Sequence, residues 1–385
     1  MNSLLHLVSL FKNVLQDQLF PVMHEALGPL SERQEQFVRA LALLGLDRFV
    51  AVRHGRGRRG YDRAGIARAF LAKAVYNLPT TRALLDRLEC DVVLRRLCGW
   101  ESAAQVPDET IFSRAFADFA RREFAQKVHA ALIQSTQSER LVGHILRDST
   151  AIEAREKPAP KPIEPTEPTE PTKPAPRRLH RKSGTATRPE QMTRLDRQCS
   201  GSMTLEEMLA ELPQDCDRGC KLDSRGKKYS WVGYKLHLDV VDGQIPISCV
   251  LTSASVNDTQ VAVPLALLSA QRVTNLYDVM DTGYDCTAIR EQSRKLGHVP
   301  IIPWQKRGAQ PTAELAPHEK ARMRERSAVE RVYSRLKDEY GGAFVRVRGW
   351  GKVMTHLMFG ILALTADQIL RWSGISASRD SEAPA

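Results

Sequence analysis

The sequence predicts an α/β domain with a mixed sheet and flanking helices over residues 141–375, preceded by an all-α region over residues 1–140. Three observations predict this fold class. The first region carries helical periodicity and helix-capping residues almost throughout. Residues 229–241 then alternate between apolar and polar side chains, as a strand does. Short apolar runs and helical segments follow in turn, a pattern typical of strands linked by helical crossovers. Residues 376–385 form a tail that we expect to be disordered.

The helices of the first region are predicted from their caps. Ser31 and Gln34 have the spacing of a capping box before a periodic apolar run, and Gly45 marks its end. Asp62 predicts the cap of a helix that runs to Val75. Further helices are expected to begin near residues 80, 91 and 108. Short helices joined by tight turns are typical of a DNA-binding bundle and equally of a dimerisation scaffold, so both interpretations stay open.

The charge of the chain favours a polyanionic partner. The formal net charge is +11 and the sequence pI is about 9.4. The densest basic cluster is a glycine-rich loop at residues 53–61, whose backbone could follow a phosphate ridge; a basic loop without a target is the alternative. We assign contacts with double-stranded DNA to Arg53, Arg56, Arg58, Arg59, Arg346, Arg348 and Lys352.

A proline-rich segment interrupts the α/β domain. Residues 156–185 contain a tandem Glu-Pro-Thr repeat and offer almost no apolar residues for a core. Prolines at every third position favour an extended, polyproline-like spacer. We therefore expect a disordered insertion within the domain rather than a boundary between domains.

The order of elements in the α/β domain indicates a known fold. The expected strands are 143–149, 229–241, 245–251, 276–281 and 298–302, and the expected helices are 257–268 and 286–296. Three strands, then alternating helix and strand, then a closing helix is the RNase H-like order. Its crossovers put the carboxyl end of the 276–281 strand beside the first strand.

Three carboxylates are the strongest candidates for a functional site. Asp148 and Asp281 each end an apolar strand, and Glu330 lies in a basic helical stretch. Hard oxygen ligands in a basic protein indicate Mg²⁺ ions acting on a phosphodiester. Asp258 is a further candidate, although a helix cap explains it as well.

Glu330 shares its helical stripe with cations. At 100° per residue, Glu330 lies about 40° from Arg326, and Lys337 about 20° from it, with Tyr333 on the same stripe. Such a face could hold metal through the carboxylate and phosphates through the cations. A solvated face with i,i+4 ion pairs is the alternative.

These residues resemble the DDE transposases of bacterial insertion sequences. The matching motifs are Asp148-Ser149-Thr150, the strand 231–237, and Asp281-Thr282-Gly283-Tyr284-Asp285. The helix matches the family's Tyr-x₂-Arg-x₃-Glu-x₆-Lys pattern at Arg326, Glu330 and Lys337, with Met323 in place of the tyrosine. The resemblance extends from about residue 60 to residue 372.

The resemblance implies a function. Asp148, Asp281 and Glu330 would hold two Mg²⁺ ions, for which Mn²⁺ could substitute, while Arg326 and Lys337 would act as catalytic cations. The enzyme would cut the terminal inverted repeats of its element and join the 3′ ends to target DNA, as a homodimer. Two alternatives stay open: a decayed DNA-binding regulator, and an RNase H-like endonuclease without strand transfer.

Other features bear on location. Seven scattered cysteines predict a reducing cytoplasm, where a transposase would associate with the nucleoid. The apolar stretch 357–364 is far shorter than a membrane span, and we expect a buried helix rather than a membrane segment. Trp350 could stack on an unpaired base or pack in the core.

Overall fold

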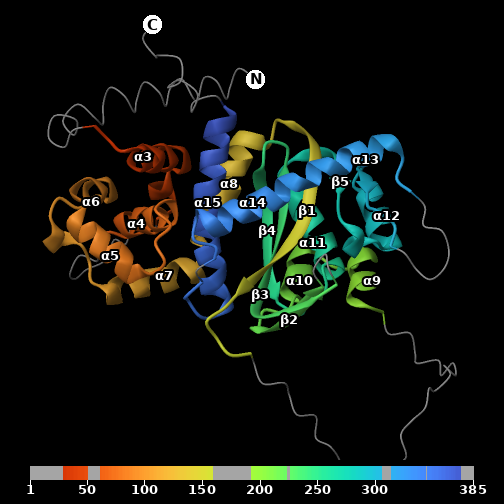
Figure 1. The fold of residues 1–385 in the computed structure, drawn as a ribbon, viewed down its shortest axis with the longest axis horizontal. Coiled ribbons are helices and arrows are strands. Elements are labelled where there is room, and N and C mark those ends of the chain that lie inside the picture. The colour runs from red at the N-terminus through yellow and green to blue at the C-terminus, as the bar shows by residue number, and fades with distance from the viewer. Residues whose placement is uncertain are drawn as a thin grey trace, which may run out of the picture.

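The computed structural model describes residues 29–50, 61–158, 192–222, 226–305, 314–343 and 345–373 (Figure 1). A helical region comes first and a mixed sheet with flanking helices follows. The helical elements of the first region are α3 (Glu32–Leu44), η1 (Leu46–Phe49), α4 (Arg63–Val75), α5 (Thr81–Cys90), α6 (Val92–Cys98), η2 (Ala103–Gln105), α7 (Glu109–Arg121) and α8 (Phe124–Gln137).

The predicted caps of these helices are confirmed. The Ser31 hydroxyl accepts from the Gln34 backbone and the Gln34 side chain accepts from the Ser31 backbone, which completes the capping box of α3. Gly45 ends that helix at φ 53°, a left-handed conformation that glycine adopts without strain. Asp62 caps α4 through the backbone amides of the first turn.

The sheet is mixed, with its longest strands at the centre. Its strands are β1 (Leu141–Glu153), β2 (Asp217–Leu222), β3 (Lys228–Val241), β4 (Ile245–Ser253), β5 (Thr274–Val279) and β6 (Val299–Ile301). The order is β2-β3-β1-β5-β6. β4 pairs with residues 234–241 of β3, on the same edge of β3 that pairs with β2 over residues 228–233. β1 is antiparallel to β3 and parallel to β5. It is longer at both ends than the predicted 143–149 segment.

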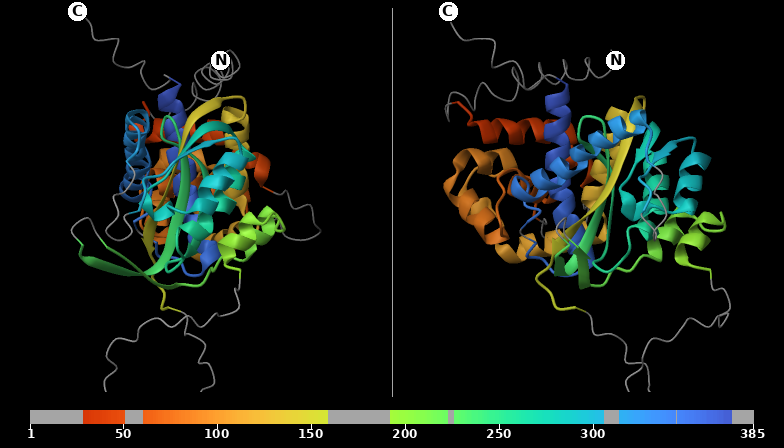
Figure 2. Two further views of the ribbon diagram at one scale, coloured as in Figure 1. Left: turned by 90° about the vertical axis from the view of Figure 1, so that its right-hand side faces the viewer. Right: turned by 45° about the vertical axis from the view of Figure 1, so that its right-hand side comes forward.

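Helices cover both faces of the sheet (Figures 1 and 2). The remaining helical elements are α9 (Arg194–Cys199), α10 (Leu205–Ala210), α11 (Thr259–Ala270), η3 (Thr282–Tyr284), α12 (Thr287–Lys295), α13 (Pro317–Met323), η4 (Arg324–Arg326), α14 (Ser327–Asp338) and α15 (Trp350–Trp372). α11 packs on one face of the sheet, and α14 crosses the other over β1 and β3. The predicted RNase H-like architecture with an all-α region before it is confirmed.

α15 joins the two regions into one core. It packs against α3, α4, α7 and α8 of the helical region and against β4 of the sheet, and in Figure 1 it stands between α3, α4 and α7 on the left and the sheet on the right. Among the described residues, only α15 is long and apolar enough to cross a membrane, and 83% of that stretch is buried inside the protein. The predicted buried helix at 357–364 is therefore confirmed as part of a core helix.

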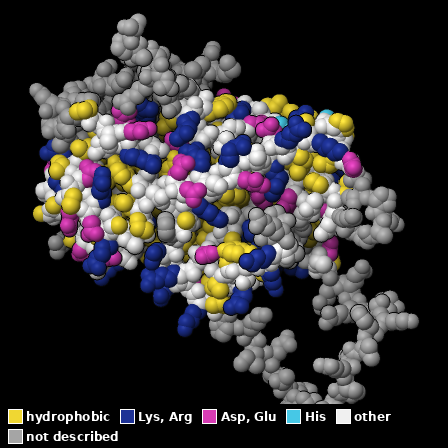
Figure 3. Space-filling model, in the orientation of Figure 1, with side chains coloured by type: hydrophobic (Ala, Val, Ile, Leu, Met, Phe, Trp, Pro, Cys, Tyr) yellow, Lys and Arg dark blue, Asp and Glu magenta, His cyan; other side chains and the backbone are white. Residues whose placement is uncertain are grey.

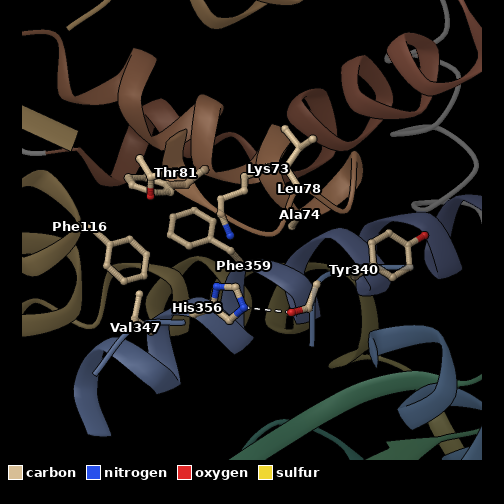
Figure 4. Close-up of a pocket in the computed structure, with 11 residues that line it drawn as sticks. Lys73, Ala74, Leu78, Thr81, Phe116, Tyr340, Val347, His356 and Phe359 are labelled. Carbon is tan, nitrogen blue, oxygen red and sulfur yellow. Dashed lines mark hydrogen bonds between the residues drawn. The ribbon is translucent and has the colours of Figure 1, made fainter. Parts of the chain in front are cut away.

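A small pocket between the helical region and α15 contains a buried lysine (Figure 4). Lys73 is 8% exposed, it lies among aromatic side chains, and no described carboxylate forms an ion pair with it. Burial lowers the pKa of Lys73 to about 8. His356 faces the same pocket and bonds the Gly341 carbonyl at 3.0 Å. Burial, together with the charge of Lys73, lowers the pKa of His356 to about 3.

Some predictions fall on residues outside the described ranges. These are the basic loop with Arg53, Arg56, Arg58 and Arg59, nearly all of the proline-rich insertion at 156–185, and the tail at 376–385.

We expect Lys73→Met to stabilise the protein at neutral pH by on the order of 3 kcal/mol, because the substitution removes a buried charge that no described residue neutralises. The lowered pKa of Lys73 also makes the stability of the protein depend on pH. The unfolded chain binds the extra proton between about pH 8 and 10.5, so the wild-type protein gains stability as pH rises through this window. The variant should not. Urea unfolding from neutral pH to about pH 10.5 measures the stability of both proteins. If the variant is no more stable than the wild-type protein at neutral pH, the buried charge of Lys73 does not destabilise the fold.

Candidate functional site

The register of β1 against β5 brings Asp148 and Asp281 together. Leu146 lies opposite Val279 in this parallel pair. Asp148 and Asp281 each come two residues later, so both lie at the same edge of the sheet. Asp281 also opens η3, where its carboxylate accepts from the Gly283 amide at 2.9 Å. An added Cβ at Gly283 would lie 3.0 Å from that carboxylate oxygen, so glycine leaves it room.

Glu330 reaches the same edge from α14, and one guanidinium contacts all three carboxylates. Arg326 Nη2 lies 3.2 Å from Asp148 Oδ2 and 3.6 Å from Asp281 Oδ2. Arg326 Nη1 lies 3.1 Å from Glu330 Oε1. Four of the five predicted catalytic residues therefore meet at one point, although they come from segments far apart in the sequence.

Burial and charge act against each other in this cluster. Burial raises the pKa of Asp148 to about 6, and the charge of Arg326 opposes the rise. Burial also raises the pKa of Asp281, again against Arg326. Burial alone would lower the pKa of Arg326, but the three carboxylates raise it above its usual value. The guanidinium therefore stays charged and holds the carboxylates together.

The rest of the α14 stripe fixes the helix to the sheet. The Tyr333 hydroxyl donates to the Asp148 carbonyl at 2.6 Å and accepts from the Leu238 amide at 3.1 Å, which ties α14 to both β1 and β3. Lys337 Nζ donates to Thr150 Oγ1 at 2.8 Å, two residues beyond Asp148. Lys337 therefore lies along β1 rather than on the carboxylates. Burial lowers its pKa, and the nearby charge of Lys221 adds to this effect.

Asp258 belongs to the surroundings of the site; it occupies the predicted N-cap position of α11, but not with a capping side chain. The side chain makes no capping bond to α11; Asn257 accepts from the Thr259 amide instead. Asp258 Oδ1 lies 3.0 Å from Lys235 Nζ and 3.8 Å from the buried His237 ring. Its charge contributes to the raised pKa of Asp148. The sequence offers only a weak signal for this role, because the pairing with Lys235 depends on how β3 packs against α11.

A buried ion pair anchors β1 behind the site. The Arg147 guanidinium binds both oxygens of Asp239 at 2.8 and 2.7 Å, and Ser269 of α11 donates to the same carboxylate at 2.7 Å. Arg147 is 2% exposed and Asp239 is fully buried. Removing one partner of such a pair leaves an uncompensated buried charge. The pair therefore fixes the strand that carries Asp148, and no sequence motif identified it.

The remaining predicted DNA contacts lie outside this cluster. Arg346, Arg348 and Lys352 are exposed, in the loop before α15 and in its first turn. The neighbouring Gly349 amide donates to Glu156, just beyond β1, so the loop lies near the end of that strand. Trp350 donates its indole N–H to the Leu251 carbonyl at 2.8 Å and packs against the core. The interpretation of Trp350 as a base-stacking residue is not supported.

The cluster has the donor chemistry for a hard divalent cation. Its side chains offer carboxylate oxygens, which are the ligands that Mg²⁺ prefers. These oxygens already surround one cationic group, the Arg326 guanidinium. With the guanidinium between them, the carboxylates are not gathered closely enough to coordinate a metal, and neither is any group of three His, Cys, Asp or Glu elsewhere in the described part of the chain. The residues therefore fit the ion by the chemistry of their oxygens, and the Arg326 guanidinium lies among these oxygens.

Asp148→Asn is expected to stabilise the metal-free protein at about pH 8 by on the order of 3 kcal/mol. The raised pKa means that the native state holds its proton up to about pH 6, whereas the unfolded chain loses it near 3.8. The wild-type protein therefore loses stability as pH rises through this window, and the variant does not. Thermal unfolding at about pH 4 and pH 8 tests this difference, which should vanish at the lower pH. If the variant is less stable than the wild-type protein at the higher pH, the buried charge of Asp148 does not destabilise the native state.

Comparison with known proteins matches two parts of the chain to transposase domains. A family model described as "Transposase DDE domain" matches residues 214–366, and one described as "Transposase domain (DUF772)" matches residues 25–118. The first match includes Asp281 and Glu330 but begins after β1, so Asp148 lies outside it. The pairing of β1 with β5 places Asp148 beside the two matched carboxylates. No protein of curated function and no solved structure shows significant similarity to the chain. The chain is therefore similar to transposases both in its helical region and in the part of the α/β domain after β1, where the match is to the transposase DDE domain.

Proposed function

We propose that this transposase cuts the ends of its insertion sequence and joins the 3′ ends to target DNA at the Asp148, Asp281 and Glu330 cluster. The observation that carries the proposal is the convergence of three carboxylates, from β1, the end of β5 and α14, on one cation at 3.1 to 3.6 Å. We further place the chain in the Tyr-Arg-Glu-Lys subgroup, on Arg326, Glu330 and Lys337.

DDE transposases use divalent metal ions, and we propose two Mg²⁺ ions here, with Mn²⁺ as a substitute. When bound, the ions would activate the attacking water or DNA 3′-hydroxyl and stabilise the leaving oxygen. The protein's own residues hold and orient this site. Asp148 and Asp281 present oxygens at one sheet edge, and Tyr333 fixes the strand that carries Asp148. Arg326 and Lys337 offer cations for the charge that grows on the phosphate oxygens.

The same site would serve both reaction steps. In the first step, water attacks the phosphodiester at the element end and the bond to the 3′ oxygen breaks. In the second step, that 3′-hydroxyl attacks a target phosphodiester, one bond forms as another breaks, and the proton leaves to solvent. A DNA hydroxyl is the nucleophile of the second step, so no covalent protein–DNA intermediate is required.

We propose that duplex DNA reaches the site over the basic surface around the end of β1. Arg346, Arg348 and Lys352 are exposed there. Figure 3 shows Lys and Arg side chains projecting along the lower edge of the face that it displays, where Figure 1 has the β2–β3 hairpin. Lys221 and Lys228 of that hairpin are exposed. Such cations bind phosphates without reading sequence.

The helical region would then recognise the terminal inverted repeats or join two protomers. The "Transposase domain (DUF772)" match over this region supports a role in transposition. Because two element ends must be joined to target DNA, we propose a homodimer on DNA. We also propose that the protein acts in the cytoplasm, at the nucleoid, which suits its seven cysteines.

Asp281→Asn and Glu330→Gln should abolish cutting of element ends while leaving end binding nearly intact, because each removes a charged metal ligand without changing shape. Glu325→Gln is the matched control, since Glu325 is exposed and lies outside the Arg326 cluster. Labelled element ends with Mg²⁺ measure cutting and joining, and gel shifts measure binding. Loss of binding together with cutting would contradict the catalytic assignment. Wild-type protein that binds only, or that cuts without joining, would instead indicate the decayed regulator or the simple endonuclease.

Replacing Arg346 and Arg348 with glutamine should weaken DNA binding equally for all sequences and reduce the slope of log affinity against log salt by about 1 for each lost phosphate contact. Arg121→Gln is the control, since this exposed arginine lies on α7, in the helical region. Fluorescence anisotropy at several salt concentrations gives the slope. An unchanged slope in the double variant would show that DNA does not pass this loop.

A further inference from the structure

We infer that Arg326 acts as the resident cation of the site in the DNA-free protein, and that metal binding requires this guanidinium to move from the carboxylates to a DNA phosphate. Metal loading is then coupled to DNA binding through one side chain. The inference rests on the proposed function of the same cluster. It adds that metal binding depends on DNA binding, which the proposed chemistry alone does not require.

The first step concerns the oxygens. A single nitrogen, Arg326 Nη2, contacts both Asp148 Oδ2 and Asp281 Oδ2, and these atoms come from the two strand ends that a shared metal would have to bridge. A divalent cation binds carboxylate oxygens at about 2.2 Å, closer than the guanidinium does. The two cations therefore compete for the same oxygens, and their like charges repel in a partly buried site.

The second step concerns what holds Arg326 in place. The side chain is 22% exposed, and its described ion-pair partners are the three carboxylates of the cluster. Asp148 Oδ2 and Asp281 Oδ2 both contact Arg326 Nη2, at 3.2 and 3.6 Å, so without a cation these two carboxylates would repel each other. Arg326 therefore positions the carboxylates near each other before any metal arrives.

The third step concerns where the guanidinium goes. Arg326 is the last residue of the short η4 turn, directly before α14, so a change of side-chain rotamer does not require the helix to move. A guanidinium binds phosphate oxygens as well as it binds carboxylates. A DNA phosphate at the site would therefore replace the partners that Arg326 loses. By linkage, DNA should tighten metal binding and metal should tighten DNA binding by the same factor.

The test measures metal binding without reference to catalysis. Full-length wild-type protein and Arg326→Gln are titrated with Mn²⁺ alone, and the free Mn²⁺ is read from its electron paramagnetic resonance signal. We expect Arg326→Gln to bind Mn²⁺ roughly tenfold more tightly than the wild-type protein in the absence of DNA, although it should cut DNA poorly. Arg331→Gln is the matched control, since Arg331 lies on the same helix and bonds Ser327. It should bind Mn²⁺ as the wild-type protein does.

A second arm adds a duplex that carries the element's own end. The duplex should tighten Mn²⁺ binding in the wild-type protein, and its effect should shrink in Arg326→Gln. Arg326→Lys keeps the charge but lacks the planar guanidinium, so its affinity for Mn²⁺ should lie between those of the wild-type protein and Arg326→Gln. This variant also keeps the test valid if the glutamine variant folds poorly. Equal or weaker Mn²⁺ binding by both variants would overturn the inference while leaving the proposed function standing. Absence of Mn²⁺ binding in every protein, with and without DNA, would overturn both.

Discussion

The parallel pairing of β1 with β5 is the constraint on which the site depends. Strand ends in a parallel pair lie at one edge, so the register that sets Leu146 against Val279 also sets Asp148 beside Asp281. A shift by one residue would turn Asp148 toward the opposite face of the sheet. The buried Arg147–Asp239 pair and the Tyr333 bond to the Asp148 carbonyl both resist such a shift.

The site shows how function opposes stability in this fold. Carboxylates that must bind a cation are held near one another in a partly buried place, where burial raises the pKa of both Asp148 and Asp281. Arg326 offsets much of this cost in the metal-free protein. The large shared core around α15 supplies the stability that such a site requires, because it joins the helical region and the sheet into one hydrophobic cluster.

Much of the fold could be predicted from the sequence because its signals are local. The caps at Ser31 and Asp62 depend on neighbouring backbone amides, and the alternation of residues 229–241 reflects the pleat of one strand. The three carboxylates could be predicted because two follow apolar runs and the third lies on a basic helix after the last strand. Their convergence on a single guanidinium could not, because the helical stripe allowed Arg326 to face DNA just as well.

The features that escaped prediction arise from contacts between distant segments. Asp258 fits a helix cap by its local pattern, and only the packing of β3 against α11 gives it Lys235 as a partner. Lys73 reads as an ordinary helical lysine, yet α15 and the aromatic side chains around it bury the ammonium. The indole of Trp350 is likewise directed by a carbonyl on β4.

The convergence of the carboxylates on a shared divalent cation is tested most directly by anomalous diffraction from crystals grown with Mn²⁺ and element-end DNA. We expect anomalous density between the carboxylates of Asp148, Asp281 and Glu330, with oxygens at about 2.2 Å, and the Arg326 guanidinium on a DNA phosphate. Density elsewhere in the protein, or carboxylates that remain bound to Arg326 with metal and DNA present, would contradict it.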